Sequence, residues 1–135
     1  MIEKYDHVGM VIRNTDEVLG VLSRLFGFEA VEALAETEAG FKSTLISKSD
    51  VTLELLEPVG PQGIIQKFME KKGGGLHHVS IRVSNLEEEM TRLREHGVQF
   101  LSEKPNQVTD TSKNIFIHPR SAAGLLIELV QRDSG

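Results

Sequence analysis

The sequence predicts an α+β fold built from two copies of one βαβββ module. A heptapeptide recurs, as DHVGMVI at residues 6–12 and HHVSIRV at residues 77–83, each followed by an asparagine and a helix-period stretch. Each half also ends in an apolar strand with a central glutamate, VTLELLE at 51–57 and LLIELVQ at 125–131. One matching heptapeptide is common by chance, but the same order of elements twice indicates an internal duplication.

The first module reads as a strand, a helix and about three strands. Acidic residues open the helix, where the helix dipole favours negative charge, and Gly27 is the expected stop. Strand candidates follow around 40–47 and at 51–57. The apolar stripe of the helix consists of Val18, Leu19, Leu22 and Leu25.

The second module repeats this order, with an apolar helix stripe at Leu86, Met90 and Leu93, a stop at Gly97 and a strand candidate around 113–118. Between the modules, a segment with a short helical stretch and three consecutive glycines is typical of a linker. We expect a single domain over residues 1–135, with module one at about 1–60, the linker at about 61–75 and module two at about 76–135.

Composition narrows the class of protein. A formal charge of −5 argues against a nucleic-acid partner, which requires a basic surface, and the absence of cysteine excludes thiolate chemistry. No apolar run reaches the ~20 residues of a membrane span, and the first residues lack the apolar stretch of a signal peptide. We therefore expect no membrane association and a cytoplasmic location.

Strand alternation sets four polar residues apart. Val79, Ile81 and Val83 share the face that can pack on the helix, so His78 lies on the opposite face. The same alternation turns His7, Glu54 and Glu128 away from the helices of their own modules. Taken singly, each has a structural explanation, as an edge-strand glutamate or a hydrogen-bonded core histidine.

Taken together, the four residues favour a metal site. A carboxylate within an apolar strand is costly to bury unless it is paired, protonated or bound to a metal. The same residue types recur at equivalent places, so a pseudo-twofold arrangement would bring two histidines and two carboxylates together. Imidazole and carboxylate ligands suit Co, Mn, Ni, Zn or Fe(II).

Longer motifs carry a resemblance over nearly the whole chain. They are DHVG at 6–9, ELLEPVG at 54–60, GGGLHHVSIRV at 73–83 and FIHPRSAAGLLIELV at 116–130. These stretches resemble the vicinal oxygen chelate (glyoxalase-like) superfamily and, within it, the methylmalonyl-CoA epimerases. The resemblance implies paired βαβββ modules whose mixed sheets form a metal-containing cleft.

The resemblance also implies a site and a reaction. His7, Glu54, His78 and Glu128 would be the ligands of a divalent ion (Co, Mn, Ni or Zn), with Glu38 as a catalytic acid/base because epimerases carry a glutamate two residues before a glycine that opens a strand. The implied reaction interconverts (2R)- and (2S)-methylmalonyl-CoA through a metal-stabilised enolate, with Glu128 as the second acid/base. An acyl-CoA substrate and a homodimer follow as expected partners. Lys67, Lys71 and Lys72 could meet CoA phosphates, and His118 could contact substrate or order its loop.

Three rival functions remain at this point. A glyoxalase I-like lactoylglutathione lyase can use the same four ligands, but the expected Asp-Pro-Asp-Gly turn is replaced here by HPRSAAG. A ring-cleaving dioxygenase would need only two histidines and one carboxylate, so Glu54 argues against it. A drug-sequestering protein of the same fold needs aromatic walls, and the chain has no Trp and one Tyr.

Overall fold

A computed structural model describes residues 1–36 and 38–133, with residues 35 and 36 described by their backbone only. The strands are hydrogen-bonded in the order β2-β3-β4-β1-β5-β8-β7-β6. The chain divides into two compact units, which we call the first unit (His7–His77) and the second unit (Met1–Asp6 with His78–Gly135). Strands β1 and β5 contribute residues to both.

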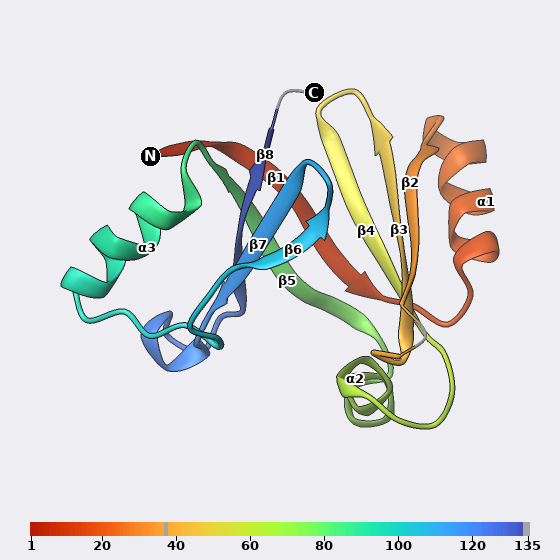
Figure 1. Ribbon diagram of the computed structural model, residues 1–135. Helices are drawn as coiled ribbons and strands as arrows, with labels where there is room; N and C mark the ends of the chain where they lie inside the picture. The colour runs from red at the N-terminus through yellow and green to blue at the C-terminus, as the bar shows by residue number, and fades with distance from the viewer. Residues whose placement is uncertain (37, 134–135) are drawn as a thin grey trace. The chain divides into compact units, whose positions relative to one another are not determined.

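The predicted order of strand, helix and three strands is confirmed in both halves (Figure 1). The first half contains β1 (Ile2–Val11), α1 (Thr15–Phe26), β2 (Glu29–Glu36), β3 (Phe41–Lys48) and β4 (Val51–Pro58), followed by α2 (Ile64–Lys72). The second half contains β5 (Gly75–Val83), α3 (Leu86–Glu95), β6 (Asn106–Thr109), β7 (Ser112–Ile117), the short 3₁₀ helix η1 (Pro119–Ser121) and β8 (Ile127–Arg132).

Each half pairs its first strand in parallel with its last. Strand β1 runs parallel to β4, with Gly9 opposite Glu54, and β5 runs parallel to β8, with Ser80 opposite Glu128. The other pairs, β2 with β3, β3 with β4, β6 with β7 and β7 with β8, are antiparallel. The mixed pairing gives both halves one topology, as a duplicated module requires.

In the first unit, α1 packs on the strand face that the alternation predicted. The stripe residues Val18, Leu19 and Leu22 contact a buried cluster of Phe28, Ile46 and Leu55. The helix begins at the side chain of Asn14, which accepts from the Glu17 N–H, and ends at Gly27 with φ 80°. This packing turns the opposite face of β1 and β4, with His7 and Glu54, away from α1.

Helix α2 is more than a linker, because it covers part of that opposite face. Its buried residues Ile65 and Met69 pack against Val11 and Leu56, within the first unit. The spacing of four between Ile65 and Met69 places both on one helical side. The sequence alone suggested a connection, because the helical stretch is short and is followed by three glycines.

In the second unit, α3 covers the corresponding face. Leu86 and Met90 join Val83, Ile115 and Leu129 in one buried cluster. The Asn85 side chain caps the helix by accepting from the Glu88 N–H. The helix ends at Glu95, before the predicted stop; Gly97 nevertheless has the left-handed φ of 83° that favours glycine.

Strand β8 begins two residues later than the sequence pattern predicted. The chain first passes through η1 and then through two residues with positive φ, Ala123 and Gly124. Leu125 is consequently exposed rather than part of the strand. Within the described residues, no helix is long and apolar enough to cross a membrane.

Candidate metal centre

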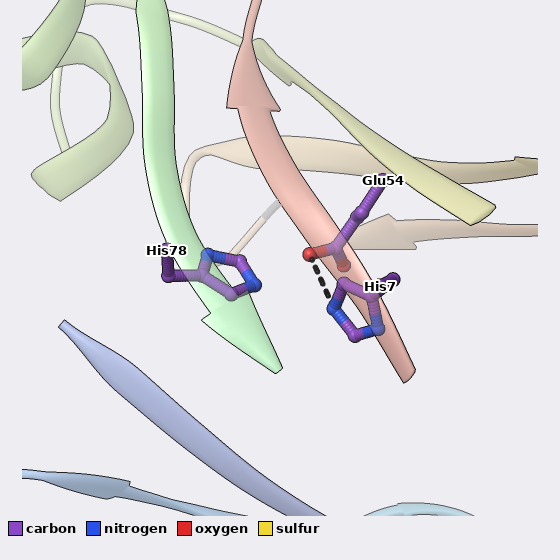
Figure 2. Close-up of side chains that lie close together, drawn as sticks. All are labelled: His7, Glu54 and His78. Carbon is purple, nitrogen blue, oxygen red and sulfur yellow. Dashed lines mark ion pairs between the residues drawn. The ribbon is translucent and has the colours of Figure 1, made fainter. Parts of the chain in front are cut away.

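His7 and Glu54 form an imidazole–carboxylate pair in the first unit. Because β1 and β4 are parallel neighbours, Glu54 lies opposite Gly9, on the face that His7 shares. The His7 Nε2 atom is 3.4 Å from Glu54 Oε1, the interaction drawn as a dashed line in Figure 2. The two side chains are 4% and 18% exposed, so little water screens the pair.

The other oxygen of Glu54 has a partner of its own. The Ser43 hydroxyl on β3 donates to Glu54 Oε2 at 2.6 Å. Ser43 pairs with Leu56 in the β3–β4 register, two residues beyond Glu54, so the contact is a diagonal one across the two strands. One carboxylate oxygen is therefore held by the sheet while the other faces the histidine.

His78 and Glu128 form the corresponding pair in the second unit. The His78 Nε2 atom is 3.7 Å from Glu128 Oε1, and the side chains are 3% and 8% exposed. The ring of Phe116, which lies opposite Glu128 in the β7–β8 register, packs edge-on against the His78 ring with 5.5 Å between centroids. This contact restricts the orientation of the imidazole.

An amide takes the place of the serine hydroxyl in the second unit. Asn114 Nδ2 on β7 donates to Glu128 Oε2 at 2.5 Å, and Asn114 pairs with Val130, two residues beyond Glu128. On β6, Asn106 Nδ2 donates in turn to Asn114 Oδ1 at 3.3 Å. Both halves thus have a diagonal hydrogen bond to the strand glutamate, donated by a hydroxyl in the first unit and by an amide in the second.

The donor set suits a divalent ion. His7, Glu54 and His78 are among the residues that could hold a metal; Glu54 is half-buried, and Glu128, the carboxylate paired with His78, is buried. Two ligand atoms each about 2.1 Å from an ion lie roughly 3.0–3.4 Å apart, close to the separations within both pairs. Ser80, opposite Glu128 in register, is 0% exposed, and its Oγ has no hydrogen-bond partner among the described residues. A buried polar atom of this kind is typical of a site completed by a ligand or water.

Glu38 lies in the turn between β2 and β3, where it is exposed. It lines an open hollow of about 560 Å³ together with residues 39–40 and 59–63 of the same unit. The turn requires its glycine, because Gly40 has φ 83° and a Cβ atom there would come within 2.4 Å of the Gln62 carbonyl oxygen. The glycine of the glutamate-x-glycine motif is therefore required by the close approach of two backbone segments. This approach fixes the position of the turn that carries Glu38.

The remaining sequence candidates have simpler roles in the structure. Lys67, Lys71 and Lys72 are exposed on α2. His118 orders its own turn, because its Nδ1 accepts from the Arg120 N–H at 3.1 Å. This contact supports an ordering role for His118, and a contact with substrate stays a prediction.

Sequence analysis missed an ion-pair cluster next to His7. Asp6 is buried and accepts from the guanidinium groups of both Arg82 and Arg132, at 2.9–3.0 Å. These contacts join β1, β5 and β8 within the second unit and fix the chain immediately before His7. Ser43, Asn106 and Asn114 were also missed, because a diagonal partner is visible only once the register is known.

Comparison with known proteins gives a consistent picture. The family model of the Glyoxalase/Bleomycin resistance protein/Dioxygenase superfamily matches residues 6–116. The mitochondrial methylmalonyl-CoA epimerase of Bos taurus is 30% identical over 129 residues, which cover 95% of this chain and 74% of that protein.

Solved structures with the same fold include methylmalonyl-CoA epimerases. The crystal structure of methylmalonyl-CoA epimerase from Mycobacterium tuberculosis has a TM-score of 0.90 at 30% identity, covering 98% of this chain and 90% of that chain. A methylmalonyl-CoA epimerase in complex with methylmalonyl-CoA and NH4+ has a TM-score of 0.87 at 26% identity, covering 98% and 96%. The chain therefore belongs to the Glyoxalase/Bleomycin resistance protein/Dioxygenase superfamily.

Proposed function

We propose that this protein is an isomerase that interconverts (2R)- and (2S)-methylmalonyl-CoA. The observation that carries the proposal is the duplicated imidazole–carboxylate pair, His7 with Glu54 and His78 with Glu128, in a chain whose relatives include methylmalonyl-CoA epimerases. Both pairs lie on the strand faces turned away from the helix of their own half. The family resemblance implies that the metal ligands, and with them the proton transfer, lie on these faces.

We further propose that the two pairs ligate one divalent ion. Nitrogen and carboxylate ligands favour Co, Mn, Ni or Zn over metals that prefer thiolates, and the chain contains no cysteine. When bound, such an ion supplies Lewis-acid stabilisation of the negative charge that develops on the thioester oxygen. A bound cation would also offset the negative charge of the buried Glu128 carboxylate and of the half-buried Glu54 carboxylate.

Inversion requires a base on one face of the reacting carbon and an acid on the other. We assign these roles to Glu38 and Glu128. The carboxylate on one side accepts the C2 proton, and the carboxyl on the opposite side donates a proton to C2, so the proton count is unchanged. Glu38 suits this role because its exposed side chain lines a hollow and because it lies in a turn whose backbone is held in place at Gly40.

An acyl-CoA substrate is the small-molecule partner that the relatives support, and the exposed lysines of α2 are candidates for contact with its phosphates. The homodimer and the cytoplasmic location expected from the sequence stay predictions. Analytical ultracentrifugation would test the first of these and cell fractionation the second.

Deuterium exchange tests the proposed reaction. The protein is loaded with Co(II) and incubated with (2S)-methylmalonyl-CoA in deuterium oxide, and C2 deuteration and configuration are followed by mass spectrometry and chiral analysis. We expect deuterium at C2 with inversion. Glu38→Gln should lower the rate by at least about a hundredfold, because general acid–base groups contribute on the order of 10²–10⁴.

A matched control separates chemistry from folding. Glu32→Gln changes a neighbouring glutamate on β2 in the same way and should leave the exchange rate unchanged. Absence of exchange by the native protein, with turnover of a glutathione hemithioacetal instead, would reassign it as a lactoylglutathione lyase. Equal losses in Glu38→Gln and Glu32→Gln would remove Glu38 from the mechanism.

A further inference from the structure

We propose that Asn114 and Ser43 are positioning residues that set how Glu128 and Glu54 present their oxygens to the metal ion. The inference rests on the proposed metal site and goes beyond its four ligands. Both donors occupy the same place in their halves, on the strand antiparallel to the glutamate strand and diagonal to the glutamate. The duplication retained the position of the donor while changing its residue type.

In each carboxylate, one oxygen accepts a hydrogen bond from the neighbouring strand and the other oxygen faces the histidine. Oε2 of Glu128 accepts from Asn114 and Oε2 of Glu54 accepts from Ser43, at 2.5 and 2.6 Å. In both residues Oε1 is the oxygen that faces the histidine Nε2. A donor fixed at one oxygen therefore stops the carboxylate from rotating about its terminal bond, which is otherwise a broad and weakly restricted torsion.

The donor in the second unit is itself oriented. The Asn114 amide could in principle turn either its nitrogen or its oxygen toward Glu128. Asn106 Nδ2 donates to Asn114 Oδ1, so the Asn114 nitrogen is left facing Glu128. Because this nitrogen can only donate, it matches a carboxylate oxygen that only accepts.

Residues that hydrogen-bond to a metal ligand orient it, and their loss typically weakens metal affinity or activity by about 10–100-fold. We therefore expect Asn114→Leu, which keeps a similar volume but removes the donor, to weaken Co(II) binding about tenfold or more. Ser43→Ala should weaken it less, because the more exposed Glu54 can regain a water molecule. Asn106→Ala should have a still smaller effect, since it acts through Asn114.

Isothermal titration with Co(II) measures the affinity, and the visible absorption of bound Co(II) reports the number and geometry of its ligands. Asn114→Ser is the conservative variant, because serine serves at the equivalent place in the first unit, and it should recover part of the affinity. Gln107→Ala is the matched control on the same hairpin. Within the described part of the chain, its amide donates to the backbone oxygens of Thr109 and Ser112 and to no glutamate of the site, so its removal should leave Co(II) binding and the spectrum unchanged.

Unchanged affinity and spectrum in Asn114→Leu, with the native melting temperature, would overturn the inference. Equal weakening by Gln107→Ala would also overturn it, since hairpin stability alone would then explain the loss. A native protein that binds Co(II) in an Asn114-dependent way but exchanges no C2 proton would support the inference and reject the proposed epimerase. A native protein without affinity for Co(II) would overturn both.

Discussion

In the first unit, Glu54 accepts a hydrogen bond from the hydroxyl of Ser43, whereas in the second unit Glu128 accepts one from the amide of Asn114, which Asn106 holds in turn. The Glu54 side chain is 18% exposed and the Glu128 side chain 8%. A hydroxyl can donate or accept as it rotates, while an amide nitrogen only donates. The second unit therefore constrains its carboxylate more tightly than the first.

The same contrast recurs where the helices begin. The first N–H of α1, on Thr15, donates to the carboxylate of Glu57, and the equivalent N–H of α3, on Leu86, donates to the amide oxygen of Gln131. Both acceptors lie three residues after the glutamate of the last strand. The duplicated fold has kept backbone register and hydrogen-bond position, while the charge of the side chains has diverged.

The largest expected effect on metal affinity follows from the different donors that bind the Glu128 and Glu54 carboxylates. In Glu128→Gln the new amide oxygen accepts from Asn114 Nδ2, which leaves the NH2 group, a donor that cannot ligate a metal, facing the ion. We therefore expect Co(II) affinity to fall at least about a hundredfold, or ~2.7 kcal/mol. Glu54→Gln should cost only about tenfold, because the Ser43 hydroxyl can rotate to accept from the new amide. Titration of both variants with Co(II) measures the difference, and equal losses would show that the two pairs serve the ion alike.

A core substitution in the second unit can introduce the residue type that the first unit has at the equivalent position. Ile115 pairs with Leu129 and is fully buried, whereas the equivalent residue opposite Leu55 is Thr44. Ile115→Thr should lower the free energy of unfolding by about 2 kcal/mol, because it removes buried methyl surface and introduces a hydroxyl without a designed partner. Urea denaturation measures the loss.

Ile115 faces the helix side of β7, while its neighbour Asn114 faces the opposite side. Ile115→Thr should therefore leave Co(II) affinity unchanged in the folded protein. Thr44→Val is the reciprocal variant and should cost less stability than Ile115→Thr. A loss of metal affinity as large as that of Asn114→Leu would show that the helix side and the metal side of β7 are coupled.

The duplication and the strand alternation were enough to predict the fold order and to place the histidine and glutamate of each half on one face. Val83 and His78 illustrate the reason, because a period of two separates the core face from the opposite face without any knowledge of pairing. Family membership, once shown, agrees with the resemblance that the motifs carried. The assignment of His7, Glu54, His78 and Glu128 to one ion, and of Glu38 to proton transfer, stays a prediction.

The supporting contacts could not be predicted, because each joins segments whose register the sequence does not state. Asn114 reaches Glu128 only through the β7–β8 pairing, which η1 and the following turn set. Asp6 accepts a hydrogen bond from Arg132, which follows it by 126 residues in the sequence. The burial of α2 on Val11 and Leu56 was missed for the same reason, because the sequence does not show which strand face its buried residues Ile65 and Met69 contact.

The smallest expected effect concerns pH and the two helix starts. Burial opposes the charge of Glu57 and would raise its pKa, but hydrogen bonds from Thr15 and the nearby Lys42 outweigh burial and lower the pKa below its ordinary 4.5. A lowered folded-state pKa means that the ionised group stabilises the protein above the unfolded pKa, and that this contribution is lost as pH falls through the folded value. Glu57→Gln should therefore cost about 1 kcal/mol at neutral pH, and the difference from the native protein should shrink below about pH 4.5.

Gln131 provides the contrast that makes this pH dependence informative. Its amide also donates to Asp133 Oδ1 at 3.0 Å, a contact that a glutamate could not make while ionised. Gln131→Ala removes a neutral acceptor from the Leu86 N–H, so its effect on the free energy of unfolding should vary less with pH than that of Glu57→Gln. Urea unfolding of both variants between pH 3 and 7 measures the two profiles. A flat Glu57→Gln difference would mean that the charge of Glu57 contributes nothing, and that both helix starts rely on the hydrogen bond alone.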